Sequence, residues 1–254
     1  YTISTTQARI MSVVAVVVFA CIAAWLLIGR NSDLLYQAQN LSFFNNTGVY
    51  FDQCMALPGG LITWTSSFLT QFFYKPTLGA SIIIAIWVVI YFVAKKALKV
   101  SSIWAGVMLV PCFLLLASTV DNEYWIYYIK QQGFWFYATL GFLVSMLMTW
   151  AATASSNWIY RTAALVVIAA TYPLFGYYSL LALIYVAVID KRLIPSVVSA
   201  LLLVATPLIA YQFYADTLAT AADIPSKSQG GKRQTCQGEH SGERNRRMSV
   251  RLPR

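Results

Sequence analysis

The sequence predicts an all-α, polytopic membrane protein with about seven transmembrane helices and an interfacial helix in its first external loop. Hydrophobic residues make up 59% of the 254 residues, and charged residues only 11%, whereas a soluble domain carries roughly 25% charged residues. The apolar residues gather into long runs. Many aromatic residues lie near the ends of these runs, as they do in the aromatic belts of membrane proteins. A soluble fold of this length could not cover its surface with so little polar material.

The first apolar run, 10–28, is long enough for a membrane span, which takes about 20 residues. A polar and aromatic stretch follows and ends at a Pro-Gly-Gly sequence at 58–60. The segment 61–74 is too short and too polar to cross a bilayer, and it suits a helix that lies at the interface or dips into it. We interpret 58–60 as the turn that begins this helix. A hinge or a close backbone approach to a ligand is the functional alternative.

The next apolar runs predict spans at 78–94, 103–118, 134–150, 162–174, 177–189 and 194–211. A single helix over the apolar run 162–189 would be about 42 Å long, which exceeds an ordinary bilayer. Pro173 and Gly176 lie in the middle of this run. Two short helices that meet at 174–178 therefore explain both its length and its composition. The break could line a cavity, but a tight hairpin is the simpler interpretation.

Basic residues orient these spans. Three lysines follow the second span within 95–99, and the positive-inside rule places them in the cytoplasm. The N-terminus is then cytoplasmic, and the stretch 30–76 is external. Splitting the run 162–189 also brings the basic pair at 191–192 inside. The sequence thus predicts a multi-pass protein of a bacterial inner membrane with a cytoplasmic N-terminus and an external C-terminus.

The segment 225–254 differs in composition from the preceding residues, 1–224, which form the predicted transmembrane domain. It has eight basic residues against two glutamates and almost no large apolar residues, so we expect a disordered basic tail. Nucleic-acid binding is the functional alternative, and we do not favour it. The four cysteines are scattered, without a CxxC or Cys/His cluster. Neither a zinc site, a disulfide framework nor another cofactor is predicted.

Histidine is absent from residues 1–224, so acid–base chemistry there would depend on a carboxylate, a lysine or a tyrosine. No carboxylate lies in the middle of a predicted span, which argues against an ion-coupled transporter. Asp33 and Asp52 lie in the long first external loop. Around Asp52, amide and aromatic side chains such as Asn46 and Tyr50 are suited to sugar hydroxyls and to the C–H faces of sugars. The same side chains could instead satisfy one another within a folded loop.

One stretch of this loop carries a resemblance. It reads Asn-Asn-Thr-Gly-Val-Tyr-Phe-Asp-Gln-Cys at 45–54, Pro-Gly-Gly at 58–60 and Phe-Leu-Thr-Gln-Phe-Phe-Tyr-Lys-Pro at 68–76. In these residues the chain resembles an uncharacterised bacterial family of multi-span membrane proteins, a domain of unknown function. The resemblance covers about residues 1–224 and implies no activity.

More distantly, the layout resembles that of GT-C-class membrane glycosyltransferases. These enzymes use a lipid-phosphate sugar donor, and they have a large first external loop with an acidic residue soon after the first span. The resemblance implies that Asp52 or Asp33 deprotonates the acceptor and that Arg30 or Lys75 holds the donor phosphate. The partners would be membrane lipids and a lipid-linked sugar. The sequence departs from this class by lacking a paired acidic motif and by having few external basic residues.

Three hypotheses remain open from the sequence, and only the first makes the protein an enzyme. The first is GT-C-like transfer of a sugar on the external face, for which Asp52→Asn abolishes function. The second is a transporter or lipid-handling protein with a broken helix at 174–178, in which Gly176 and Tyr177 are the sensitive positions. The third is a membrane anchor for an external domain, in which replacement by other spans of similar topology is tolerated.

Overall fold

The computed structural model describes residues 5–100, 102–120, 133–155, 157–189 and 193–222. Within these residues every regular element is a helix, so the predicted all-α class is confirmed. The chain divides by its packing into two units, Tyr1–Ala210 and Tyr211–Arg254. The account below concerns the first unit. The predicted basic tail at 225–254 lies outside the described residues.

Seven helical segments occupy the positions of the seven predicted spans. They are α1 (Thr5–Ala24) continued by the π-helix η1 (Trp25–Arg30), α5 (Pro76–Ala97), the 3-10 helix η3 (Ser102–Leu109) continued by α6 (Val110–Val120), α7 (Phe134–Thr153), α8 (Trp158–Ala170), α10 (Tyr177–Ile189) and α11 (Leu193–Ala222). Several begin or end a few residues beyond the predicted apolar run. One reason is that polar residues can continue a helix, as the lysines at the end of α5 do.

Four stretches of the described chain are long and apolar enough to cross a membrane: Ile10–Arg30, Pro76–Ala97, Phe134–Thr153 and Ile194–Gln212. Three further apolar helices are shorter, and α8 and α10 have only 13 residues each. The protein is therefore a polytopic helical membrane protein. The number of seven spans stays a prediction, because the three shorter helices fall below the usual length of about 17–25 residues.

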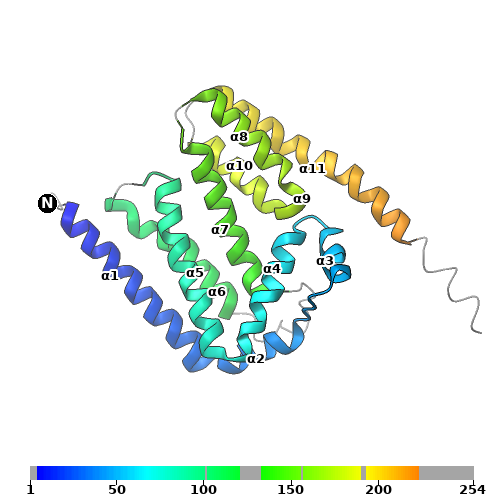
Figure 1. Cartoon of the computed structure of the whole chain (residues 1–254). Helices are drawn as coiled ribbons and strands as arrows, with labels where there is room; N and C mark the ends of the chain where they lie inside the picture. Colours follow the sequence, from blue (N-terminus) through cyan, green and yellow to red (C-terminus); the bar gives the residue numbers. More distant parts are fainter. Residues whose placement is uncertain (1–4, 101, 121–132, 156, 190–192, 223–254) are drawn as a thin grey trace, which may run out of the picture. The chain divides into compact units, whose positions relative to one another are not determined.

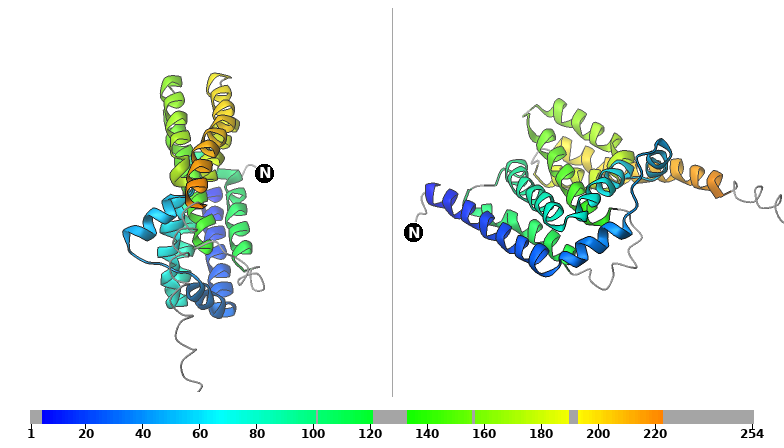
Figure 2. Two further views of the ribbon diagram at one scale, coloured as in Figure 1. Left: turned by 90° about the vertical axis from the view of Figure 1, so that its right-hand side faces the viewer. Right: turned by 60° about the horizontal axis from the view of Figure 1, so that its bottom comes forward.

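Helix α5 packs along α7 and also contacts α1 (Figures 1 and 2). Trp87 on α5 is fully buried, and its indole N–H donates a hydrogen bond of 3.1 Å to the Thr139 hydroxyl on α7. Small residues such as Ala94 and Gly141 are buried in the bundle, and such residues allow helices to approach closely in membranes. A hydrogen-bonded tryptophan and close helix packing thus hold α5 and α7 against each other.

The first loop folds into four short helical elements: α2 (Ser32–Leu41), α3 (Gly48–Met55), α4 (Gly60–Thr70) and the 3-10 helix η2 (Gln71–Tyr74). The helix predicted at 61–74 is thus present, but its last turn is 3-10 rather than α. The physical reason is Pro76, which disfavours α-helical geometry at the residue before it. The helix therefore ends in a tighter 3-10 turn. Pro76 itself occupies the start of α5, where a missing N–H costs nothing.

Helix α4 packs against the beginning of α7 and against the short helix α9 (Tyr172–Phe175) (Figure 1). Gly59 has φ = +88°, which favours glycine, and its N–H donates a hydrogen bond of 3.0 Å to the Pro173 carbonyl. Gly176, also at positive φ, approaches the same backbone: a Cβ on it would lie 3.2 Å from the Gly59 Cα. The two glycine turns visible in the sequence are therefore in contact with each other.

The predicted break of the run 162–189 is also confirmed. Helix α8 ends at Ala170, α9 follows as a single turn, and α10 begins at Tyr177. The break thus begins three residues earlier than the predicted 174–178. Thr171 is the C-cap of α8. Its backbone N–H donates to carbonyls of the last turn of α8, and its hydroxyl donates to the Ile168 carbonyl of the same turn.

The bundle has two distinct ends. We call the end that carries α2, α3, α4, η2, α9 and the beginnings of α5 and α7 the loop-rich end. The other end carries the ends of α5 and α7 and the beginning of α8, and we call it the lysine end. Its cations are Lys95, Lys96 and Lys99 at the end of α5, and Arg161 in the first turn of α8. By the positive-inside rule, the loop-rich end would be external.

Candidate functional site

The junction between the first span and α2 has an unusual backbone. The last turn of the span, Trp25–Arg30, is π-helical. Segments of π-helix are rare and occur often at functional sites. The chain then turns at Asn31, whose N–H donates to the Leu26 carbonyl over 3.1 Å, and α2 begins at Ser32. This turn brings three polar residues, Arg30, Asn31 and Asp33, to the loop-rich end of α1.

Asn31 is only 5% exposed, and its amide Nδ2 has no hydrogen-bond partner in the described structure. An unpaired buried amide costs free energy of about 1–3 kcal/mol. It lies at the N-terminus of α2, where the side chain of the N-cap residue makes no capping hydrogen bond. Helix N-termini attract anions, because their first N–H groups are unpaired and the helix dipole is positive there. Asn31 is thus a buried donor at an anion-attracting position.

Arg30 and Asp33 are both exposed on either side of Asn31. Arg30 supplies a guanidinium that can bind a phosphate in a bidentate manner. Asp33 lies in the first turn of α2, where a carboxylate also stabilises the helix by roughly 0.3–1 kcal/mol. The structure therefore brings together a cation, a donor and a carboxylate within one turn of chain.

A groove of about 710 Å³ lies between the first span and α6. Ile22 of α1 and Leu26 of η1 line it on one side, and the α6 residues Phe113, Leu116, Ala117, Ser118 and Val120 line it on the other. Six of these seven side chains are apolar. Leu26 is about one helical turn from Arg30 along the chain, or roughly 6 Å. The first span thus borders a largely apolar groove in the stretch that precedes the polar junction.

Asp52 is not part of the Arg30–Asp33 junction. It is exposed on α3, and α3 packs against α4, whereas α2 packs against η1, η2 and α5. The other predicted site residues divide between these two places. Lys75 is exposed directly after η2 and therefore follows an element that packs on α2, while Asn46 is exposed just before α3. The first loop thus separates the two candidate acids rather than joining them in one cluster.

Tyr50 serves the packing of α3 in the described structure. Its hydroxyl donates a hydrogen bond of 3.1 Å to the Phe43 carbonyl, and its ring makes edge contacts with Phe43 and Phe44. Phe44 continues these contacts to Trp64 and Phe68 of α4. Burial raises the pKa of the Tyr50 hydroxyl and also that of the nearby Cys54 thiol. These aromatic contacts attach α3 to α4, the packing role that the sequence left open as an alternative.

The broken helix, the second candidate region, is closely packed. The Tyr177 hydroxyl donates to the Tyr178 hydroxyl over 2.8 Å, and the rings of Tyr137, Tyr177 and Tyr178 contact one another. Gly141 lies directly beneath the Tyr178 ring. The contact of Gly59 with Gly176 closes the same region. The simpler sequence interpretation, a tight hairpin between short helices, agrees with this packing.

Sequence reasoning missed three parts of the Arg30–Asp33 junction: the π-helical turn, the buried Asn31 amide and the groove beside α6. A weak signal was present, since Arg30 and Asn31 form a polar pair directly after an apolar run. The groove had no such signal, because it depends on how α1 and α6 pack.

Comparison with known proteins finds a matching family. A model for a family of unknown function, DUF6057, matches residues 6–230 of this chain. Neither a curated protein nor a solved structure matches it. The resemblance to GT-C enzymes therefore stays an expectation from the sequence. Because the match covers most of its length, the chain belongs to the DUF6057 family.

Proposed function

We propose that this protein binds a lipid-phosphate substrate at the Arg30–Asp33 junction and transfers a sugar from it, as GT-C-class enzymes do. The observation that carries the proposal is the groove between the first span and α6, whose lining on that span includes Leu26, one helical turn before Arg30. An apolar groove with a cationic and hydrogen-bonding end suits a lipid tail joined to a phosphate. Arg30, the N–H groups of α2 and the unpaired Asn31 amide are the groups that would hold the phosphate.

Asp33 is the carboxylate nearest to this phosphate site along the chain, so we assign it the role of general base. It would take the proton from an acceptor hydroxyl as the acceptor oxygen bonds to the anomeric carbon. The bond between that carbon and the phosphate oxygen would break, and the lipid phosphate would leave with the electron pair. Asp52, Tyr50, Asn46 and Lys75 are then outside the centre of the reaction.

Lipid binding tests the first half of this proposal. The purified protein in nanodiscs is offered a polyprenyl phosphate and the matching polyprenyl alcohol, and retained lipid is measured by native mass spectrometry. We expect preferential retention of the phosphate. Arg30→Gln should lower it about tenfold to 100-fold, because a hydrogen bond to a charged group contributes roughly 1.5–3 kcal/mol. Equal retention of alcohol and phosphate would contradict the proposal.

A groove-filling substitution sharpens the test. Leu26→Trp should reduce retention of both lipids, because it fills the groove beside α6. Val18→Trp, at an exposed position on the same helix outside the groove lining, is the matched control and should leave retention unchanged. If Leu26→Trp also has no effect, the lipid does not occupy this groove.

The broken helix supports a second candidate, a transporter or lipid-handling protein. The observation that favours it is the contact of two positive-φ glycines, Gly59 and Gly176, between the first loop and the break. Opening this contact would separate α4 from α9. Under this hypothesis Gly176→Ala and Tyr177→Phe impair function, while Asp33→Asn does not.

A further inference from the structure

Helix α2 carries a polar face that begins at the Arg30–Asp33 junction. Four exposed residues lie on this face: Asp33, Tyr36, Gln37 and Asn40. Their i, i+3, i+4 and i+7 spacing places them on one side of the helix, and we call them the α2 stripe. Because an α-helix rises 1.5 Å per residue, the stripe is about 10 Å long. Asp33 belongs both to the junction and to the stripe.

The opposite face of α2 holds the helix in place. Leu34, Leu35 and Ala38 are buried. They belong to the hydrophobic cluster that includes Phe73 of η2 and Ile83 of α5, the two elements against which α2 packs. Rotating α2 about its axis would expose these apolar side chains to solvent, which costs free energy. The packing therefore keeps the α2 stripe on the outside of the bundle.

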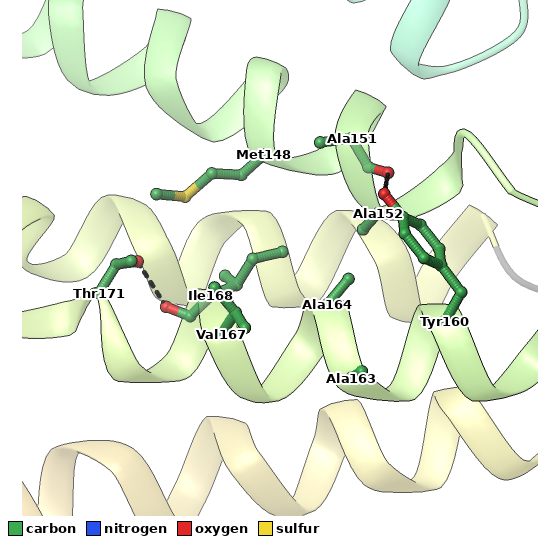
Figure 3. A pocket seen from close by; sticks show the side chains of 9 residues that line it. All are labelled: Met148, Ala151, Ala152, Tyr160, Ala163, Ala164, Val167, Ile168 and Thr171. Atoms are coloured by element: carbon green, nitrogen blue, oxygen red, sulfur yellow. Dashed lines mark hydrogen bonds between the residues drawn. The ribbon is translucent and has the colours of Figure 1, made fainter.

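The side chains of the α2 stripe are available to a ligand. Within the described part of the chain, none of the four makes a hydrogen bond, an ion pair or a ring contact. Other tyrosines differ in this respect, since the Tyr50 hydroxyl already donates to a backbone carbonyl. The Tyr160 hydroxyl, in a groove between α7 and α8, donates to the Ala151 carbonyl over 3.2 Å (Figure 3). Tyr36 has its ring and its hydroxyl free for an external partner.

The composition of the stripe suits a carbohydrate. Sugar hydroxyls both donate and accept hydrogen bonds, and each amide of Gln37 and Asn40 also offers both kinds of group. The ring of Tyr36 can cover a C–H face of a sugar, because the face of an aromatic ring is electronegative. The stripe has no cation, and its single charge is the Asp33 carboxylate. It therefore favours a neutral sugar over an anionic one.

We propose that the α2 stripe binds the acceptor of the sugar transfer and that this acceptor is a neutral oligosaccharide. The inference rests on the function proposed above, because it supplies the hydroxyl that Asp33 deprotonates. The terminal sugar of the acceptor lies at Asp33. The following unit lies along Tyr36, Gln37 and Asn40, since the stripe is longer than a single sugar ring.

The transfer step balances with this placement. The hydroxyl oxygen of the terminal acceptor sugar bonds to the anomeric carbon of the donor, and its proton passes to the Asp33 carboxylate. The bond between the anomeric carbon and the phosphate oxygen breaks, and the lipid phosphate leaves with the electron pair. Asp33 then releases the proton to water.

Binding of oligosaccharides to the full chain in nanodiscs tests the inference without requiring turnover. The probes are the neutral trisaccharides maltotriose, cellotriose, mannotriose and chitotriose, with trigalacturonic acid as the anionic counterpart. Affinities are measured by titration with saturation-transfer difference NMR. We expect at least one neutral trisaccharide to bind, and to bind more tightly than trigalacturonic acid. If no neutral trisaccharide binds the unaltered protein, the inference is overturned.

Substitutions in the stripe locate the bound sugar. Tyr36→Ala should weaken binding about tenfold, whereas Tyr36→Phe, which keeps the ring, should retain most of it. Gln37→Ala should weaken binding about twofold to tenfold through the lost hydrogen bond. Gln53→Ala removes an exposed amide from α3 and is the matched control that should change nothing. If Tyr36→Ala and Gln37→Ala bind like the unaltered protein while all variants stay folded by circular dichroism, the sugar lies elsewhere and the inference fails.

Retention of polyprenyl phosphate, measured on the same samples, separates this inference from the proposed function. Retention that depends on Arg30, without binding of any trisaccharide, leaves the donor site standing and overturns the acceptor site. Trisaccharide binding that depends on Tyr36, without retention of polyprenyl phosphate, supports the α2 stripe as a sugar site and contradicts the proposed transfer.

Discussion

The loop-rich end and the lysine end of this bundle differ in the length of their connections and in the residues that distinguish them. At the loop-rich end, the residues between η1 and α5 form four short helical elements. Aromatic ring contacts hold these elements together, and the contact of Gly59 with Gly176 attaches them to the end of α9. At the lysine end, the described connections are short, and the distinctive residues are cations against neutral partners.

This difference indicates a division of roles. A folded cap with a buried unpaired amide and a carboxylate can orient a substrate, because its parts are fixed by packing. A group of lysines on short connections can attract anionic lipid and set the orientation of the chain, but it offers no carboxylate among its described residues for acid–base chemistry. The proposed chemistry therefore belongs to the loop-rich end.

The largest expected effect is on the sugar transfer that we propose for the loop-rich end. Asp33→Asn should lower sugar transfer by about 10²–10⁴-fold, the usual contribution of a general base. Asp52→Asn, on α3, should leave transfer close to that of the unaltered protein. The measurement is transfer of labelled sugar from a lipid-phosphate donor in nanodiscs.

Stability must be measured beside activity, because Asp33 also stabilises the N-terminus of α2 by roughly 0.3–1 kcal/mol. A loss of transfer that follows a loss of folded protein does not support a general base. If Asp52→Asn alone abolishes transfer, the site belongs to α3, and the assignment of the Arg30–Asp33 junction is wrong.

The next largest effect concerns the packing of α3 against α4 at the loop-rich end. A Cβ on Gly60 would overlap the backbone carbonyl of Cys54, whereas a Cβ on Gly48 would meet no atom within 4 Å. Gly60→Ala should therefore lower the free energy of unfolding by about 1–3 kcal/mol, as overpacking does. Gly48→Ala should leave it unchanged or raise it by up to about 1 kcal/mol through helix propensity. Thermal unfolding in detergent measures both, and equal effects would contradict the close approach of α3 and α4.

A smaller effect is expected in the bundle between the two ends. Thr139→Val removes the hydroxyl that accepts a hydrogen bond from the buried Trp87 indole. Hydrogen bonds between membrane helices contribute about 0.6–2 kcal/mol, so the free energy of unfolding should fall by about that amount. Thr162→Val, whose hydroxyl bonds only its own helix in the described contacts, serves as the control. No difference between the two would mean that the bond between α5 and α7 adds nothing.

The smallest effect is a difference in thiol reactivity at the loop-rich end. Burial raises the pKa of the Cys54 thiol, so less of it is thiolate at neutral pH, and the thiolate is the reactive form. With the other cysteines replaced, Cys54 should react with a membrane-impermeant maleimide more slowly than a cysteine at the exposed position Asn46. Its rate should keep rising at higher pH. Labelling of both from the external side supports the predicted orientation, and labelling only after permeabilisation would reverse it.

The sequence predicted the all-α membrane class, the positions of seven helical segments, the helix after the Pro-Gly-Gly turn and the break near Pro173. These features depend on local composition: long apolar runs need a helix in a bilayer, and proline and glycine interrupt it. They can therefore be predicted from residues that are close together in the sequence. The candidate acids were also identified by residue type, although the sequence did not separate their roles.

Only the tertiary structure brought Gly59 against Gly176, left the Asn31 amide buried without a partner, and placed Asp33 and Asp52 on helices with different neighbours. It also formed the two grooves, from faces of α1, α6, α7 and α8 that look alike in an apolar sequence. The physical reason is that contacts between distant segments depend on how whole helices pack, and side-chain shape at the interface decides that packing. Hydrophobicity specifies which segments enter the membrane, and packing determines which of their residues meet.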